Sequence, residues 1–147
     1  MKPVHFLFLI PFCWLACQSV DSPKIGEVPA ITLLNTAPVQ VVEYQDSIVF
    51  TLEYTDGDGD LGTNDDTQRN VFAADNRVDV VHEFRLKQLA PDGAEIPITG
   101  TFTVTLDNTV LTGGGTEETV SFRLWVRDQA GNLSNEVASP PITVKAQ

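Results

Sequence analysis

A run of acidic residues, 55-TDGDGDLGTNDD-66, holds the side chains of this sequence best suited to chemistry. Five aspartates fall within these twelve residues, and no basic residue lies among them. Asp56, Asp58 and Asp60 are separated by single glycines, which let a backbone bend tightly enough to turn alternate carboxylates toward one point. Ca²⁺ takes roughly six to eight hard oxygen ligands, whereas most transition metals favour nitrogen or sulfur. The run therefore predicts a Ca²⁺ site, in which the metal also relieves the repulsion among the carboxylates.

The spacing differs from that of an EF-hand loop, which needs Gly at the sixth position and Glu at the twelfth. Counted from Asp56, those positions hold Leu61 and Thr67, so further ligands must come from elsewhere. The candidates are Asp128 and Asn132 in the segment RDQAGNLSN. The alternative is a purely polar turn, because Asp-Gly pairs form turns unaided and Asp128 would then bond its own neighbouring backbone.

Alternation of apolar and polar residues runs through most of the chain after its N-terminal segment. In residues 47–54, Ile48, Phe50, Leu52 and Tyr54 fall on one face of an extended strand. The other expected strands are residues 31–34, 39–42, 80–86, 101–106, 119–127 and 142–145. Short alternating strands with turn signals between them predict an all-β fold, an immunoglobulin-like antiparallel β-sandwich of about seven strands.

This fold would bring the two candidate loops together. If residues 47–54 and 119–127 are the second and sixth strands of the sandwich, the loops that follow them meet at the same end. Asp128 and Asn132 would then approach the acidic run. Residues 56–79 form the longest stretch without an expected strand, and loops of this length are usually functional or partly disordered.

The N-terminal segment has the proportions of an export signal. Lys2 precedes an apolar stretch from Val4 to Ala16 that is too short to span a bilayer. The sequence Trp14-Leu15-Ala16-Cys17 resembles the lipobox of bacterial lipoproteins, in which the cysteine takes the lipid and becomes the first residue. We therefore expect lipidation at Cys17. The alternatives are an ordinary secretory signal or an uncleaved membrane anchor.

The expected organisation is a lipoprotein signal peptide over residues 1–16, a flexible tether over 17–29 and the sandwich domain over 30–147. The tether is polar and contains two prolines. Both cysteines lie within residues 13–17, so the mature domain has no disulfide and must rely on its hydrophobic core.

The charge of the chain limits its partners. A formal net charge of -11 disfavours nucleic acid and anionic lipid surfaces, and it is compatible with a divalent cation. Attachment to a membrane would come from acyl chains on Cys17 rather than from electrostatic attraction. Gln18 follows the cysteine in place of the Asp that resembles an inner-membrane retention signal in some bacteria, which favours the outer membrane.

Three pieces of the sequence together resemble a known family. These are FTLEYTDGDGDLG at 50–62, WVRDQAGNLSN at 125–135 and the short final strand. The pattern resembles immunoglobulin-like lipoproteins of Bacteroidota cell envelopes, which carry a DGDGDLG-type loop after an early strand and a D-x-A-G-N-x-S-N turn near the end. The resemblance covers about residues 30–145. It implies an immunoglobulin-like or cadherin-like sandwich in the cell envelope, and it implies no activity.

The residues offer little for catalysis. His82 is the one histidine after Cys17, and it lies on a strand at a position of apolar parity. Glu117 and Glu118 are neighbours on an expected strand, so they point to opposite faces and do not form an acid–base pair. The chain is therefore predicted to be no enzyme.

Trp125 is the candidate binding residue. It has outward parity between Arg123 and Arg127, where it could stack on a sugar ring or anchor a protein partner. The alternative is that it covers the outer face of a sheet, with the Arg stems packed beside it. The sequence thus predicts a non-catalytic, lipid-anchored envelope module, structural or adhesive, with a Ca²⁺-stabilised loop end. The alternative function is an accessory carbohydrate- or protein-binding surface lipoprotein.

Overall fold

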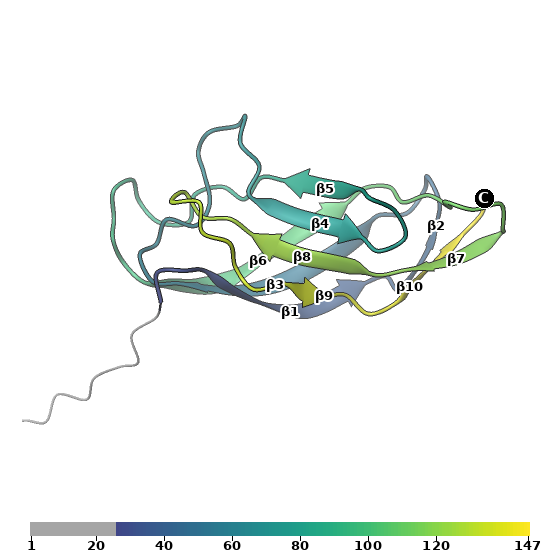
Figure 1. Cartoon of the computed structure of the whole chain (residues 1–147), viewed down its shortest axis with the longest axis horizontal. Helices are drawn as coiled ribbons and strands as arrows, with labels where there is room; N and C mark the ends of the chain where they lie inside the picture. The colour runs from purple at the N-terminus through teal and green to yellow at the C-terminus, as the bar shows by residue number, and fades with distance from the viewer. Residues whose placement is uncertain (1–25) are drawn as a thin grey trace, which may run out of the picture.

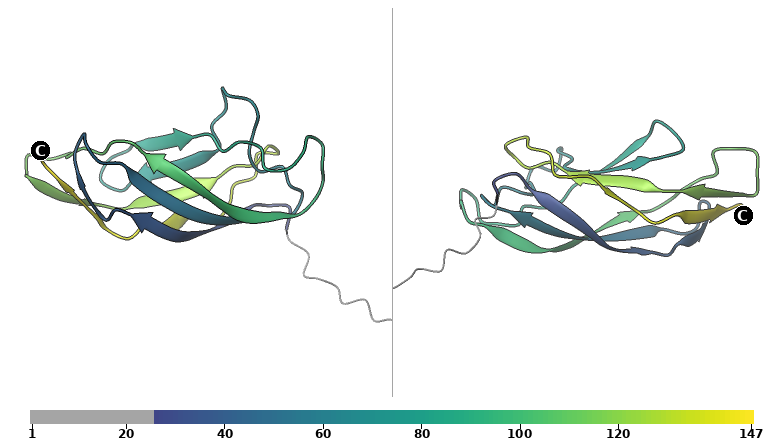
Figure 2. Two further views of the ribbon diagram at one scale, coloured as in Figure 1. Left: turned by 180° about the vertical axis from the view of Figure 1, so that it is seen from behind. Right: turned by 60° about the horizontal axis from the view of Figure 1, so that its bottom comes forward.

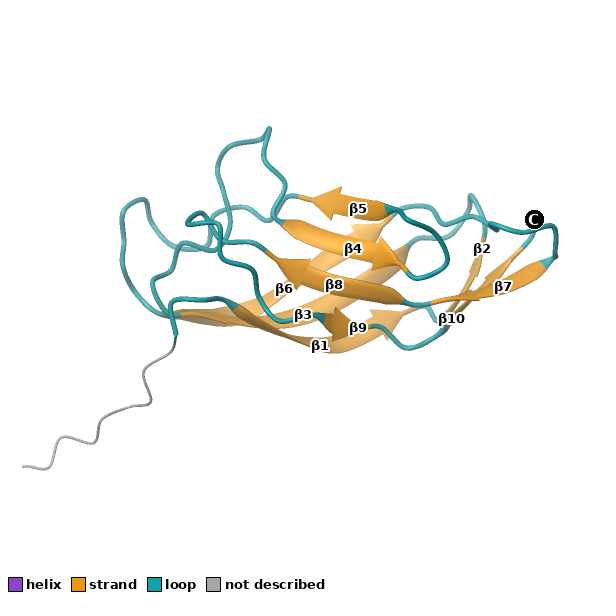
Figure 3. Ribbon diagram, in the orientation of Figure 1, coloured by secondary structure: helices purple, strands orange, loops and turns teal. Residues whose placement is uncertain are grey.

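The computed structural model describes residues 26–147, and within that range the chain forms ten β-strands and no helix (Figures 1 and 3). The strands are β1 (Ala30–Ala37), β2 (Gln40–Val42), β3 (Ile48–Asp56), β4 (Val71–Asp75), β5 (Val81–Phe84), β6 (Ile98–Leu106), β7 (Glu117–Val120), β8 (Phe122–Val126), β9 (Val137–Ala138) and β10 (Ile142–Lys145). In this part of the chain, no helix has the length and apolar character needed to cross a membrane. The predicted signal peptide, Cys17 and most of the tether lie outside the described residues.

The strands form three sheets arranged as a sandwich. One layer has the order β1-β3-β6 and the facing layer has the order β5-β4-β8-β9, and every pairing in these two sheets is antiparallel (Figure 2). The third sheet, β2-β10-β7, lies at the end of the molecule near the C-terminus, where β2 runs parallel to β10 (Figure 1). The predicted all-β sandwich is confirmed.

The core lies between the two layers, and the period-two alternation builds it. On β3 the residues from Ile48 to Asp56 alternate between fully buried and partly exposed positions. Phe50 of β3 meets Phe122 of β8 edge to face, with ring centroids 5.6 Å apart. Burial of large apolar side chains from both layers removes their surface from water, which is the main favourable contribution to folding in a domain without a disulfide.

Two expectations about strands were wrong. Residues 71–75 lie inside the stretch expected to be irregular, yet they form β4, which is buried along its whole length and therefore shows no alternation. Residues 119–127 form two strands, β7 and β8, which belong to different sheets. The break falls at Ser121, whose backbone N–H donates to the Asn76 side chain while its carbonyl accepts from the Asn76 N–H.

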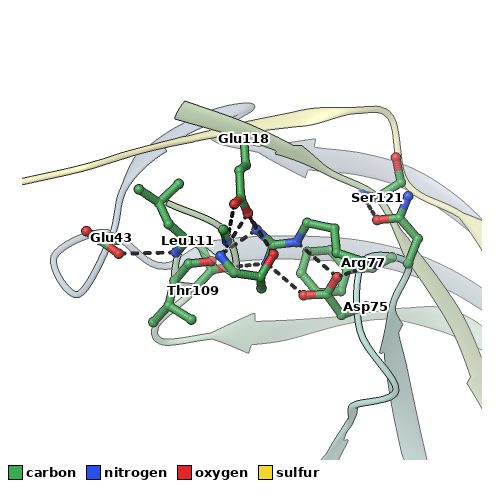
Figure 4. Close-up of polar contacts among 12 residues, drawn as sticks. Glu43, Asp75, Arg77, Thr109, Leu111, Glu118 and Ser121 are labelled. Carbon is green, nitrogen blue, oxygen red and sulfur yellow. Dashed lines mark hydrogen bonds and ion pairs between the residues drawn. The ribbon is translucent and has the colours of Figure 1, made fainter. Parts of the chain in front are cut away.

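A largely buried arginine side chain holds the end of the sandwich where β4 turns into β5 (Figure 4). The Arg77 guanidinium donates to Asp75 Oδ2 at 2.7 Å and to Glu118 Oε2 at 3.0 Å. It also donates to the carbonyl of Val110, in the connection after β6. The side chains of Arg77 and Asp75 are only 11% and 5% exposed. One cation therefore neutralises carboxylates from two sheets and satisfies a backbone carbonyl from a third segment.

We predict that Arg77→Ala lowers the free energy of unfolding by about 3 kcal/mol, because it leaves the carboxylate of Asp75 buried without a cation. Arg123→Ala is the matched control, since the Arg123–Glu136 pair is largely exposed and should contribute less than about 1 kcal/mol. Urea unfolding followed by circular dichroism measures both. Equal losses for the two variants would show that the buried network has no special structural role.

Candidate metal centre

The acidic run begins inside the fold rather than on its surface. Asp56 is the last residue of β3 and is 0% exposed, because the chain turns back over it and inserts Leu61 into the core. The backbone N–H of Leu61 donates to Asp56 Oδ2 at 2.9 Å. Leu61, which breaks the EF-hand spacing, is therefore the residue that anchors this loop.

Two glycines make the turn feasible. Gly59 and Gly62 have φ values of 77° and 94°, a region that side-chain-bearing residues rarely adopt. A Cβ at either position would also collide with a backbone carbonyl, that of Ile96 or that of Lys87. The tight bend was expected at the glycines beside Asp58, and the structure uses Gly59 for it, together with Gly62 after Leu61.

Three carboxylates converge in this turn. One carboxylate oxygen from each of Asp56, Asp58 and Asp60 lies within 4.8 Å of the others. At a Ca–O distance of about 2.4 Å, two oxygens bound to one ion are at most about 4.8 Å apart, so this spacing fits a single ion. The Oδ1 atoms of all three residues are buried and have no hydrogen-bond partner within the described part of the chain. Buried polar atoms are almost always paired, so three unpaired carboxylate oxygens in one turn make this cluster a candidate for holding a metal ion.

The electrostatics of the turn point the same way. Burial, with repulsion from Asp58 and Asp60, raises the pKa of Asp56 to about 6, although the Leu61 N–H lowers it. Burial also raises the pKa of Asp60, and the charges of Asp128 and Asp58 add to this effect while the Ala130 N–H opposes it. The folded chain thus holds these carboxylates in a place that disfavours their ionised form unless a cation is bound.

The loop after β8 meets this turn, as the sequence predicted. The backbone N–H of Ala130 donates to Asp60 Oδ2 at 2.9 Å, and the Gln129 side chain donates to the carbonyl of Gly62 at 3.0 Å. Figure 1 shows the loops after β3 and β8 at the same end of the molecule. Sequence reasoning gave no role to Gln129 or Ala130, because a backbone N–H leaves no signature in residue types.

Asp128 and Asn132 lie beside the three carboxylates but are engaged with each other. Asp128 is 5% exposed, and its two oxygens accept from the Asn132 backbone N–H at 2.7 Å and the Asn132 amide at 2.9 Å. This is the local turn that stood as the alternative to a ligand role. Asp65, near the end of the acidic run, accepts hydrogen bonds from Thr67 and Gln68.

An open depression of about 610 Å³ adjoins the turn. Its lining includes Asp58, Asp60 and three further carboxylates, and no lysine or arginine. The three further acids are Glu27, Asp92 and Glu95. Asp58 and Asp60 line this depression while Asp56 does not, and the acidic lining favours cations near the turn.

Trp125, the candidate binding residue, is half-buried on the outer face of the β4–β8 pair. Its ring stacks on Phe72, its cross-strand neighbour, with centroids 5.4 Å apart and planes 15° from parallel. The Arg127 guanidinium lies 5.3 Å from the centre of the Phe72 ring. This arrangement favours the covering role over the binding role, and a ligand at Trp125 stays a prediction.

No protein-family model matches this chain, and a search of curated proteins finds no match to it. The chemistry of the site therefore rests on its own residues and geometry.

We predict that the metal-free protein becomes less stable as pH rises from about 4 to about 6. The pKa of Asp56 is about 6 in the folded chain against an ordinary 3.8, so the folded state binds the proton more tightly than the unfolded state does. The resulting stabilisation is complete below the lower value and lost as pH passes the higher one. Urea unfolding in chelator at several pH values measures this slope.

The variant Asp56→Asn should flatten that slope, because the amide does not titrate. Added Ca²⁺ should also reduce the loss of stability with rising pH, because the metal binds the ionised carboxylates. Asp66→Asn, an exposed change in the same segment, is the control and should leave the slope intact. Some slope should remain in Asp56→Asn, because the pKa of Asp60 is raised as well, but a slope of undiminished size would contradict the assignment.

Proposed function

We propose that this chain is a non-catalytic module whose loop end is fastened by Ca²⁺ bound to Asp56, Asp58 and Asp60. The observation that carries the proposal is the convergence of one carboxylate oxygen from each of these residues to within 4.8 Å of the others. Each residue also has a buried oxygen without a hydrogen-bond partner among the described residues. Backbone carbonyls and water would complete the shell of oxygens. All the side-chain ligands are oxygens, which favours Ca²⁺ over transition metals.

The ion would act as a structural fastener between two loops. Asp60 Oδ2 accepts from the Ala130 N–H while Oδ1 has no partner among the described residues, so a metal held by Asp60 would be coupled to the loop after β8. Asp128 would support this site through its charge and its turn. With no disulfide in the described residues, the bound ion would be the strongest link between these loops.

The module is proposed to be immunoglobulin-like and to belong to the envelope lipoproteins that its motifs resemble. The strand order supports this: β1, β3 and β6 share one layer while β4 and β8 share the other, which parallels the first, second and fifth against the third and sixth strands of that fold. Cys17 is proposed to carry the lipid and to attach the module to the outer membrane. Its role there would be structural or adhesive.

The surroundings of the remaining candidate groups support a non-catalytic role. His82 packs edge-on against Phe122, and burial lowers its pKa. Glu118 is tied to Arg77 and Thr112, while Glu117 on the opposite face pairs with Lys145. The two glutamates are thus held in ion pairs and hydrogen bonds, and His82 packs against an aromatic ring of the core.

We predict that Ca²⁺ raises the melting temperature and that chelator lowers it. A ligand present at about 100 times its dissociation constant stabilises the folded state by about 2.7 kcal/mol. Asp58→Asn should abolish most of this shift, because it removes one of the three carboxylate ligands. Since Asp58 Oδ1 has no hydrogen-bond partner among the described residues, the change should leave the fold of the turn intact. Asp66→Asn, outside the convergent set, should retain it. Calorimetric titration of the two variants and the parent chain with CaCl₂ measures binding directly.

The absence of heat with Ca²⁺, combined with a melting temperature that chelator leaves unchanged, would rule the site out. Equal binding by Asp58→Asn and the parent would place the ion elsewhere on this acidic chain. Titration with MgCl₂ in parallel tests the choice of metal, since Mg²⁺ demands a more regular shell and gives up its water reluctantly.

We predict that growth with a labelled fatty acid transfers the label to the parent chain and not to Cys17→Ala. The thiol of Cys17 is the proposed attachment point, so its loss should also release the protein from the membrane fraction. Cys13→Ala is the matched control, because that residue would leave with the signal peptide. Labelled Cys17→Ala protein would contradict the proposed anchor.

A further inference from the structure

The outer edge of β6 stands out among the sheet edges. β6 spans nine residues, and it pairs with β3 in one unbroken register from Ile98 to Leu106. Within residues 26–147, no backbone hydrogen bond joins its other edge to any segment. A row of free N–H and C=O groups in a regular strand is a template for pairing with another strand.

The other edges of the two main sheets are short or covered. β5 and β9 contain four and two residues. β1 carries an irregularity between Leu33 and Asn35. The Asn135 side chain also bonds both the N–H and the carbonyl of Ile31, at 2.9 Å each, which caps the free edge of that strand. β6 has none of these protections.

The residues of β6 also lack the usual deterrents to pairing. The sequence ITGTFTVTL contains no charged residue and no proline. Its odd-numbered positions are exposed threonines, and its even-numbered positions face the core. Natural edge strands are commonly blunted by lysine, proline or a bulge, so their absence over nine residues favours an edge that has a partner.

The charges around the edge suit a second copy of this chain. A groove of about 480 Å³ lies between β5 and β6, and its lining includes Asp66, Glu83, Arg69 and Arg85. Two acidic and two basic residues balance each other there, on a chain whose net charge is -11. Two copies that meet at this groove therefore avoid the repulsion that their other acidic surfaces would cause, and they can exchange opposite charges across it.

The register of β6 against itself is complementary. In an antiparallel pair about a two-fold axis at Phe102, Thr101 lies opposite Thr103 of the second copy, and Thr99 lies opposite Thr105. Gly100 meets Val104 and Ile98 meets Leu106, so every threonine faces a threonine and every inward residue faces an inward residue. Cross-strand pairs of this kind stabilise a sheet, and a two-fold interface requires such self-complementarity.

We propose that two copies of this chain associate through their β6 edges about a two-fold axis at Phe102, which joins two β1-β3-β6 sheets into one continuous sheet. Backbone hydrogen bonds supply the pairing and the threonine rows fix the register. This proposal is independent of the metal site, which lies at the loop end, so the dimer should persist in chelator.

The test uses the full-length chain in non-ionic detergent, with sedimentation velocity over a range of concentrations. The parent is expected to dimerise. Thr101→Lys/Thr103→Lys sets lysine against lysine across the axis and should yield a monomer. Thr101→Lys/Thr103→Glu sets lysine against glutamate twice in the proposed register and should restore the dimer. Thr32→Lys/Thr119→Lys adds the same charge as the first variant at exposed positions away from β6 and should remain dimeric.

The first variant reduces the net negative charge, so general repulsion would not explain its dissociation. Circular dichroism must show all variants folded, and a charge-swapped variant that restores the dimer excludes unfolding as the cause. A monomeric parent would overturn the proposal, and so would dimers in the double-lysine variant or equal behaviour of the two β6 variants. A monomeric parent whose β6 pairs with a strand from a different protein would overturn it as well.

Discussion

The burial of the Asp56 carboxylate is the constraint on which this end of the molecule depends. β3 carries Asp56 into the interior at 0% exposure, and the next five residues must then satisfy it. Leu61 does so partly, by filling the core and donating its N–H to one oxygen. The other oxygen is left without a donor, and the same holds for Asp58 and Asp60. A buried ionised group without a partner costs several kcal/mol, so the turn is incomplete as a purely protein structure.

At the other end of the sandwich, the last residue of β4, Asp75, is a buried carboxylate that the protein itself neutralises. Asp75 is almost as buried as Asp56, and it has Arg77 beside it at 2.7 Å. That arginine also donates to Glu118 and to a backbone carbonyl, so the chain itself neutralises and hydrogen-bonds these buried groups. Among residues 26–147, no arginine or lysine side chain forms an ion pair with Asp56, Asp58 or Asp60. The contrast between two buried carboxylates in one small domain is the strongest reason to expect that an external cation completes the second.

The alternation of apolar and polar residues predicted the strands that have one buried and one exposed face. It missed the strand whose two faces are both buried. β3 and β6 alternate because one face is dry and the other wet, so their positions could be predicted to within a few residues. β4 is buried on both faces, and its five residues gave no periodic signal. The division of residues 117–126 between two sheets depends on Asn76, which lies far away in sequence. The meeting of the two loops followed from strand order, but the groups that join them, such as the Ala130 N–H, are independent of side-chain type.

The same topology that assembles the carboxylates also leaves β6 exposed. β3 is the central strand of its sheet, so β1 and β6 must both be edges. The loop after β8 that closes the aspartate turn continues to Asn135, which covers the edge of β1. No segment of residues 26–147 performs this task for β6, and the chain crosses from β5 to β6 at the loop end without adding a strand between them. The acidic residues at the loop end repel the same surface of a second copy, whereas β6 has no charged residue to oppose pairing with another strand. The two proposed sites therefore lie on different sides of one sandwich, with the proposed cation site at the loop end and the proposed strand pairing along the β6 edge.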